Sequence, residues 1–196
     1  MTTPMLRTAV ACLLLSVQAL AGAAERAIDK SVVVAATLDQ AWQAWTTREG
    51  IRSFFAPDAQ VEPRVGGAFH IHMDPGAPAG AKGADDMRFL AVQPQKMISF
   101  DWNAPPHLAQ VRAQRTFVIV RFEPLSAQAT RVSLHHTGWG DGGEWDRAHA
   151  YFERAWGGVL ANLQKRFDSG PYDWTDWLAQ LERWRAEAAA KAAAPR

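Results

Sequence analysis

Cysteine is nearly absent from this sequence of 196 residues, and so is an excess of charge of either sign. Cys12 is the only cysteine, which excludes a disulfide framework and a cysteine-ligated zinc site. The 21 Lys and Arg residues nearly balance the 20 Asp and Glu residues, whereas a nucleic-acid-binding protein normally carries a clear basic excess. No nucleic-acid partner is therefore expected. After residue 24 no stretch is long and apolar enough to span a bilayer, so no membrane span is expected in the mature chain.

Tryptophan is the residue type in unusual supply. The chain has nine Trp and nine Phe against two Tyr. Rings at this density fill a core, line a pocket or mark an interface. With 48% hydrophobic and 21% charged residues, the chain can bury a core, and intrinsic disorder is not expected.

Residues 1–24 have the three parts of a secretory signal peptide. Arg7 gives a positive start, an apolar run surrounds Cys12, and the small-residue run 21–24 precedes the expected cut. We expect cleavage after Ala23 or Ala24 and export, either to a bacterial periplasm or out of the cell. An uncleaved N-terminal anchor is the alternative.

The rest of the chain divides into a mixed domain, residues 25–170, and a tail, residues 171–196. Apolar side chains at even spacing predict a strand over 28–36, and Thr37 is placed to cap the first of two short helices, over 38–45 and 49–55. A Pro-, Gly- and Ala-rich loop is expected over 74–84. Alternating patterns predict further antiparallel strands at 69–73, 87–92, 98–102, 117–120 and 132–136.

The pattern then changes to a helical period. Apolar residues separated by three or four positions predict a long amphipathic helix that ends at Gly170-Pro171. The tail predicts a second amphipathic helix, rich in Trp, which runs into an Ala-rich end. The fold class is therefore α+β. The stripe of the long helix comprises Trp145, His149, Phe152, Trp156, Val159, Leu163 and Phe167.

Three stretches resemble the heat-shock-protein-90 ATPase activator homologue family. Residues 41–56 contain AWQAWTT, EGI and FFA. Residues 65–102 contain VGGAF, then Pro94 and FDW, and residues 130–160 contain HTGW followed by the aromatic pattern of the long helix. This family is part of the helix-grip superfamily (SRPBCC), which includes steroid-transfer (START) domains, pathogenesis-related allergens and polyketide cyclases.

The resemblance implies a curved antiparallel sheet wrapped around the long helix, with an elongated cavity between them. Two features depart from the family: the export signal and the added Trp-rich helix. A chaperone-activating role is not expected, because the cytoplasmic ATPase would be absent from the compartment of an exported protein. The motifs specify a fold and not a reaction.

Two histidines are candidates for chemistry inside that cavity. His149 lies on the apolar stripe of the long helix, and His136 shares the inward face of the last strand with Val132 and Leu134. Each is either a proton-transfer group near neutral pH or a core histidine that needs a hydrogen-bond partner. The predicted ligand-binding residues are these histidines and the rings around them: Trp102, His136, Trp139, Trp145, His149, Phe152 and Trp156.

A second histidine pair raises the question of a metal. His70 and His72 share one face of a strand, a spacing that zinc sites use. Phe69, Ile71 and Met73 claim the buried side, so both histidines should point outward, and no third ligand of matching parity is evident. No metal and no cofactor are expected.

The resulting prediction is an exported protein that holds a small apolar or amphipathic molecule in an internal cavity. One alternative is an enzyme of cyclase, isomerase or hydrolase type that uses His136 and His149. Another is a protein-interaction module that uses the C-terminal helix. The sequence leaves open the oligomeric state, and whether Gly157-Gly158 permits a close approach or a bend in the long helix.

Overall fold

The computed structural model describes residues 25–193. The predicted signal peptide, residues 1–24, lies outside the described residues. Strands and helices alternate as a mixed fold, in the following order: β1 Ile28–Val34, α1 Leu38–Thr46, α2 Arg48–Arg52, β2 Asp58–Val61, β3 Phe69–His72, β4 Gly83–Ala84, β5 Phe89–Gln93, β6 Met97–Trp102, α3 Ala109–Arg112, β7 Thr116–Ser126, β8 Ala129–Thr137, α4 Gly143–Ser169 and α5 Thr175–Ala193.

The strands form two antiparallel sheets. The larger sheet has the order β1-β8-β7-β6-β5, and the smaller one has the order β2-β3-β4. An isolated bridge between Ala68 and Arg88 joins the start of β3 to the start of β5. In the larger sheet Val120 lies opposite Leu134, and Val32 lies opposite Val132, two positions before Leu134. The side chains of these residues therefore share one face of the sheet.

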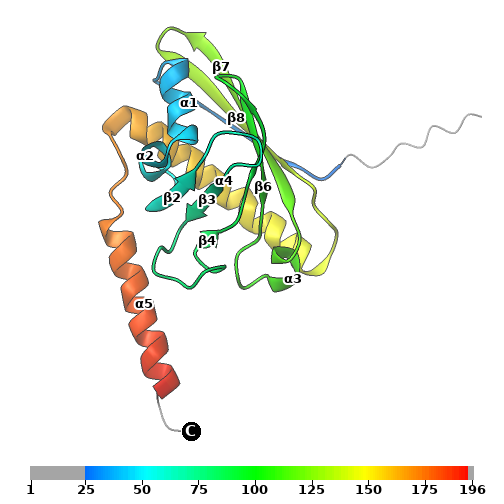
Figure 1. The fold of residues 1–196 in the computed structure, drawn as a ribbon, viewed down its shortest axis with the longest axis vertical. Helices are drawn as coiled ribbons and strands as arrows, with labels where there is room; N and C mark the ends of the chain where they lie inside the picture. Colours follow the sequence, from blue (N-terminus) through cyan, green and yellow to red (C-terminus); the bar gives the residue numbers. More distant parts are fainter. Residues whose placement is uncertain (1–24, 194–196) are drawn as a thin grey trace, which may run out of the picture.

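Helix α4 crosses that face and buries its apolar stripe against it (Figure 1). Helices α1 and α2 lie near the C-terminal end of α4, where the Arg166 Nε–H donates to Ser53 Oγ at 3.1 Å. Helix α3 lies near its N-terminal end, where Glu144 accepts from the backbone N–H of Gln110. The α+β helix-grip fold expected from the sequence is therefore confirmed.

Local sequence signals explain several boundaries. Thr37 caps α1 as predicted: its Oγ1 accepts from the Gln40 backbone N–H at 3.2 Å, and the Gln40 side chain accepts from the Thr37 N–H at 2.9 Å. Helix α4 ends at Gly170, whose φ of 99° favours glycine. Strand β2 and helix α3 were not predicted, because each has only four residues and too few positions to show a period.

Helix α5 packs back on the domain. The indole N–H of Trp174 donates to the Arg52 carbonyl at 2.6 Å, and that of Trp177 donates to the Met73 carbonyl at 2.7 Å. Leu181 is buried, and Arg185 forms an ion pair with Asp74. Helix α5 thus holds the segment between β3 and β4 from outside. Within residues 25–193, none of the helices has the length and hydropathy that crossing a membrane requires.

Two glycines in helices predict opposite effects on stability. A Cβ added to Gly157 in α4 would meet open space, so Gly157→Ala should raise the free energy of unfolding by about 1 kcal/mol. A Cβ added to Gly50 in α2 would lie 2.6 Å from the Ala44 carbonyl oxygen, so Gly50→Ala should lower it by roughly 1–3 kcal/mol. Urea denaturation measures both. A gain at Gly50 or a loss at Gly157 would contradict this packing.

Candidate functional site

An apolar cavity of about 190 Å³, partly open to solvent, lies between α4 and the segments that follow β3 and β6. Helix α4 contributes a row one step away from its buried stripe: Tyr151, Ala155 and Val159, each four positions after the last. The segment after β6 and the turn before β4 form the other walls. The apolar lining comprises Phe55, Met73, Ala84, Trp102, Phe152, Ala155, Trp156 and Val159.

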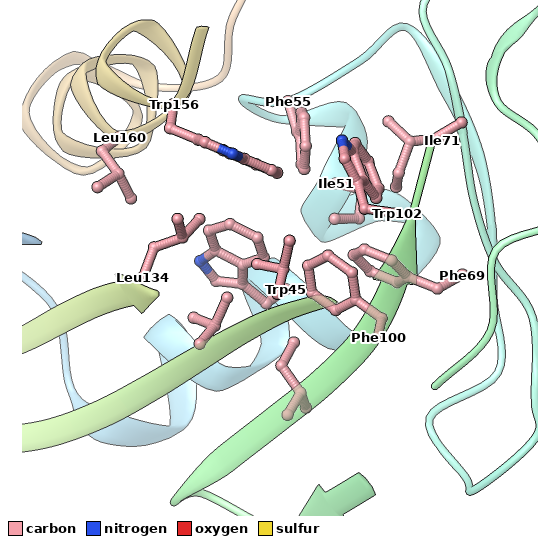
Figure 2. Packing of buried hydrophobic residues seen from close by; sticks show 14 of the residues in the cluster. Trp45, Ile51, Phe55, Phe69, Ile71, Phe100, Trp102, Leu134, Trp156 and Leu160 are labelled. Atoms are coloured by element: carbon pink, nitrogen blue, oxygen red, sulfur yellow. The ribbon is translucent and has the colours of Figure 1, made fainter. Parts of the chain in front are cut away.

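Two tryptophans at the inner end of the cavity are fixed by the core. The ring centroids of Trp102 and Trp156 are 5.4 Å apart, and Phe55 contacts both. Figure 2 shows these three rings facing one another between α4, α2 and β6. Trp156 is 1% exposed and Trp102 is 4% exposed, so the protein holds both rings rigidly around the cavity.

Trp156 is oriented by a chain of hydrogen bonds that passes through His136. An indole N–H can only donate, so His136 Nδ1 is the acceptor in its 2.8 Å bond from Trp156 Nε1. His136 therefore carries its proton on Nε2 and donates to Thr116 Oγ1 at 2.7 Å. The Thr116 hydroxyl donates in turn to the Trp102 carbonyl at 3.2 Å. Both ring nitrogens of His136 are thus occupied within the core.

The same environment keeps His136 neutral. Its side chain is fully buried, and this burial lowers the pKa of the imidazole to about 3, with a smaller contribution from the charge on His149 when that ring is protonated. A neutral imidazole with both nitrogens bonded has no free position for a substrate proton. His136 acts here as a positioning residue for Trp156.

Four of the predicted ligand-binding residues pack into an aromatic cluster beside the cavity: His136, Trp139, Trp145 and His149. The ring centroid of Trp139 is 4.2 Å from that of His136 and 5.1 Å from that of His149. These four do not line the cavity, whereas Trp102, Phe152 and Trp156 do. Phe152 lines the cavity and also contacts the aromatic cluster, with its ring centroid 5.2 Å from that of His136. The Nε2 atom of His149 is buried without a hydrogen-bond partner among the described residues.

The mouth of the cavity is polar. Lys82, Asn103 and Arg112 line it, and the same three residues line a neighbouring polar depression of about 460 Å³. The other charged or ionisable residues of that depression are His70, His72, Asp85, Asp86 and Arg115. A molecule in the apolar cavity would therefore meet charged side chains at the end that opens to water.

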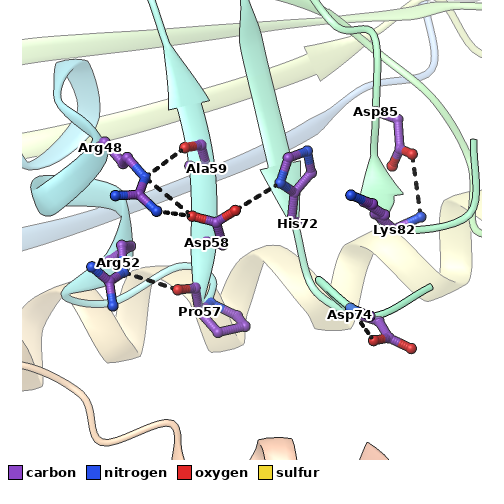
Figure 3. A network of polar contacts seen from close by, with 10 residues as sticks. Arg48, Arg52, Pro57, Asp58, Ala59, His72, Asp74, Lys82 and Asp85 are labelled. Carbon is purple, nitrogen blue, oxygen red and sulfur yellow. Dashed lines mark hydrogen bonds and ion pairs between the residues drawn. The ribbon is translucent and has the colours of Figure 1, made fainter. Parts of the chain in front are cut away.

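The second histidine pair lies on this polar side. Phe69 and Ile71 are buried, and the two histidines are on the opposite face of β3, as predicted. His72 Nδ1 is 3.1 Å from Asp58, which also receives the Arg48 guanidinium (Figure 3). Asp58 belongs to β2 and pairs with His72 across the sheet, so the sequence pattern did not reveal it. Among residues 25–193, no His, Cys, Asp or Glu side chains gather in a group of three that could bind a metal ion.

The sequence matches the family described as Activator of Hsp90 ATPase homolog 1-like protein over residues 35–168. The chain belongs to this family. The resemblance noted in its three motif stretches is thus confirmed, and the Activator of Hsp90 ATPase homolog 1-like region includes the cavity walls from Phe55 to Val159. No curated protein matches the chain.

Several solved structures share this fold. A Mesorhizobium loti protein has a TM-score of 0.60 and 21% identity, over 75% of this chain and 100% of its own. The Aha1 dimer from Colwellia psychrerythraea has a TM-score of 0.56 and 19% identity, over 74% and 98%. CalU16 from Micromonospora echinospora has a TM-score of 0.55 and 19% identity, over 85% and 88%. At these identities the likeness shows the fold alone.

Sequence reasoning did not find the polar residues at the mouth. Lys82 lies in a loop, Asn103 follows a strand end, and Arg112 belongs to the four-residue helix α3. None of them belongs to a periodic pattern or a known motif. The available signal was the cluster of Gly and Pro residues around them, which indicates loops. Loops placed on a rigid scaffold often carry binding residues.

His136 predicts a loss of stability in acid. Because its pKa is about 3 when folded and about 6.5 when unfolded, the unfolded state binds more protons between these values. This contribution to stability is complete above pH 6.5, and declines by up to about 1.4 kcal/mol per pH unit as the pH falls toward 3. Urea denaturation from pH 7 to pH 4 should show the decline in the unaltered protein, and a smaller one in His136→Gln. Equal slopes would contradict a neutral, buried His136.

Proposed function

We propose that this chain is an exported protein that holds a small apolar or amphipathic molecule in the cavity between α4 and the segments that follow β3 and β6. The observation that carries the proposal is the apolar cavity itself, with Trp102, Phe152 and Trp156 in its wall and charged side chains only at the mouth. Small-molecule sites are commonly built this way, from an apolar pocket and a few polar groups that orient the ligand.

The volume limits the ligand. A protein cavity of about 150 Å³ binds benzene. The cavity here measures about 190 Å³. The buried part of the ligand is therefore one ring with one or two further carbons, or an alkyl chain of about six carbons. A sterol or a whole phospholipid exceeds this space, so the proposed cargo is a small metabolite-sized molecule rather than a membrane lipid.

Holding rather than turnover is the activity that these contacts support. His136 uses both ring nitrogens inside the core, and His149 is turned into the aromatic cluster away from the cavity. The cavity wall itself carries no histidine. A general base must reach the proton that it removes. Neither candidate histidine meets this condition for a molecule in the cavity.

A substitution that fills the cavity tests the proposal. Ala155 lines the cavity on α4, so Ala155→Phe should prevent binding of toluene, a neutral probe of suitable size. Ala161 is exposed on the same helix, and Ala161→Phe is the matched control with the same helix-propensity cost of roughly 0.5 kcal/mol. In the unaltered protein and in the control, toluene should shift the indole N–H NMR signals of Trp102 and Trp156. The signal of Trp184, which is 50% exposed and does not line the cavity, should stay fixed.

Two outcomes would count against the cavity as a binding site. One is the absence of any shift at Trp102 and Trp156 in the unaltered protein at millimolar toluene. The other is an equal response of Ala155→Phe and Ala161→Phe, which would place the probe elsewhere.

Export has its own test. Protein recovered from the host cell should lack the first 23 or 24 residues, because the small-residue run 21–24 provides the cleavage site. Mass spectrometry of the intact chain, together with fractionation of the cells, measures both the cut and the compartment. A full-length chain that stays inside the cell would contradict export and leave the cavity proposal standing.

A further inference from the structure

The polar mouth of the cavity carries an excess of positive charge. Three ionisable side chains line the cavity at this end: Asp74, Lys82 and Arg112. The carboxylate of Asp74 forms an ion pair with Arg185 of α5, so its charge is already matched. Lys82 and Arg112 have no such match: within residues 25–193, no carboxylate oxygen lies within the 4 Å range of an ion pair with either side chain. A ligand of complementary charge is therefore an anion.

Arg112 is held in place by backbone oxygens. Its guanidinium donates to the carbonyl of Ala104 and to those of Gly80 and Gly83, the latter at 2.9 Å. These bonds connect α3 with the turn before β4 and with the segment after β6. Carbonyl groups satisfy the donors but supply no full negative charge, so no ion pair neutralises the cation at the mouth, and the charge of Asp85 acts on it only from beyond ion-pair distance. Burial lowers the pKa of Arg112, and the nearby Asp85 opposes this, but a guanidinium stays protonated at neutral pH.

Asp85 faces a different direction. It lines the polar depression but not the apolar cavity. Its Oδ2 accepts from the backbone N–H of Lys82 (Figure 3) and from that of Gly80. The carboxylate thus shapes the turn that carries Lys82. The ammonium group of Lys82 has no hydrogen-bond partner among the described residues, although the residue is half-buried.

Asn103 supplies an independent observation. The residue is 7% exposed and lines both the cavity and the depression. Its side-chain amide makes no hydrogen bond to the rest of the described chain and is not among the buried polar atoms that lack a partner, so the amide is open to water at the mouth. An amide can donate from its nitrogen to an anionic oxygen at the position where the apolar space ends.

We propose that the ligand is a small organic acid, with its apolar body in the cavity and one carboxylate group at the mouth, held by Lys82, Asn103 and Arg112. This inference rests on the proposed function and adds the class of molecule. The three groups belong to separate segments that meet only at the mouth, so an acid bound there would also tie these segments together. An apolar body of about six carbons fits the space behind them.

The test compares two molecules that differ in charge and share the same chain, hexanoate and hexanamide. Their dissociation constants are measured at pH 7.5 in low salt, from the shifts of the Trp102 and Trp156 indole signals. Hexanoate should bind roughly tenfold more tightly, as expected for one charge-assisted contact. Because partly exposed charges are screened by salt, this preference should shrink at 0.5 M NaCl while the affinity for hexanamide stays the same.

The variant Lys82→Gln removes one cation without touching the bonds that Arg112 makes. It should lose most of the preference for hexanoate over hexanamide. Lys96 is exposed on the turn between β5 and β6, outside the cavity and the depression, so Lys96→Gln is the matched control and should keep the preference. Dispersed indole N–H signals of Lys82→Gln show that the variant is folded.

The outcomes separate this inference from the proposed function. Equal binding of hexanoate and hexanamide by the unaltered protein overturns the acid and leaves the cavity as a neutral site. A preference for hexanoate that survives in Lys82→Gln and at high salt overturns the assigned headgroup position. Failure of toluene, hexanamide and hexanoate alike overturns the proposed function together with the inference.

Discussion

The packing of α4 across one face of the five-stranded sheet is the contact on which the rest of the structure depends. The helix is 27 residues long and buries Phe152, Trp156, Leu160 and Leu163 in the core. Each such side chain contributes about 1.5–3 kcal/mol when it is buried. The opposing sheet residues, such as Leu134, meet them directly (Figure 2). Because the stripe has a helical period and the strands alternate, only one face of each element can satisfy this contact.

The same contact explains why a cavity remains between α4 and the segments that follow β3 and β6. The stripe at 152, 156, 160 and 163 is filled by the sheet, whereas the adjacent row at 151, 155 and 159 faces the segments after β3 and β6. These segments are rich in Ala, Gly and Pro and have few large side chains to offer. Among the large rings that do reach the space, Trp102 and Trp156 are linked by the hydrogen bonds through His136 and Thr116. The cavity thus results from the shortage of large side chains in the loops that face this row of α4.

The sequence pattern predicts those elements whose hydrophobic period extends over enough residues to be recognised. The helix-grip class, the Thr37 cap, the inward face of β8 and the buried positions 152, 156 and 163 of α4 all follow from spacing. Val159 was expected in the same stripe, but Leu160 is buried there and Val159 lies in the adjacent row. The position of the cavity does not follow from spacing, because the rows on either side of the stripe are equivalent in the sequence. Which row stays open depends on the loops that approach it. For the same reason the expected pocket residues divided: Phe152 and Trp156 line the space, whereas Trp139 and His149 pack beside it. Asp58 and Arg112 were missed because they lie on elements of four residues.

The position of Arg185 has a consequence for the order in which the chain can assemble. Its partner Asp74 precedes it by 111 residues, and both Trp174 and Trp177 reach back to segments made long before them. The residues of the sheet and of α4 precede those of α5 in the chain, so they are made first. The cation that neutralises Asp74 at the rim of the cavity is therefore made after the residues that enclose the apolar interior.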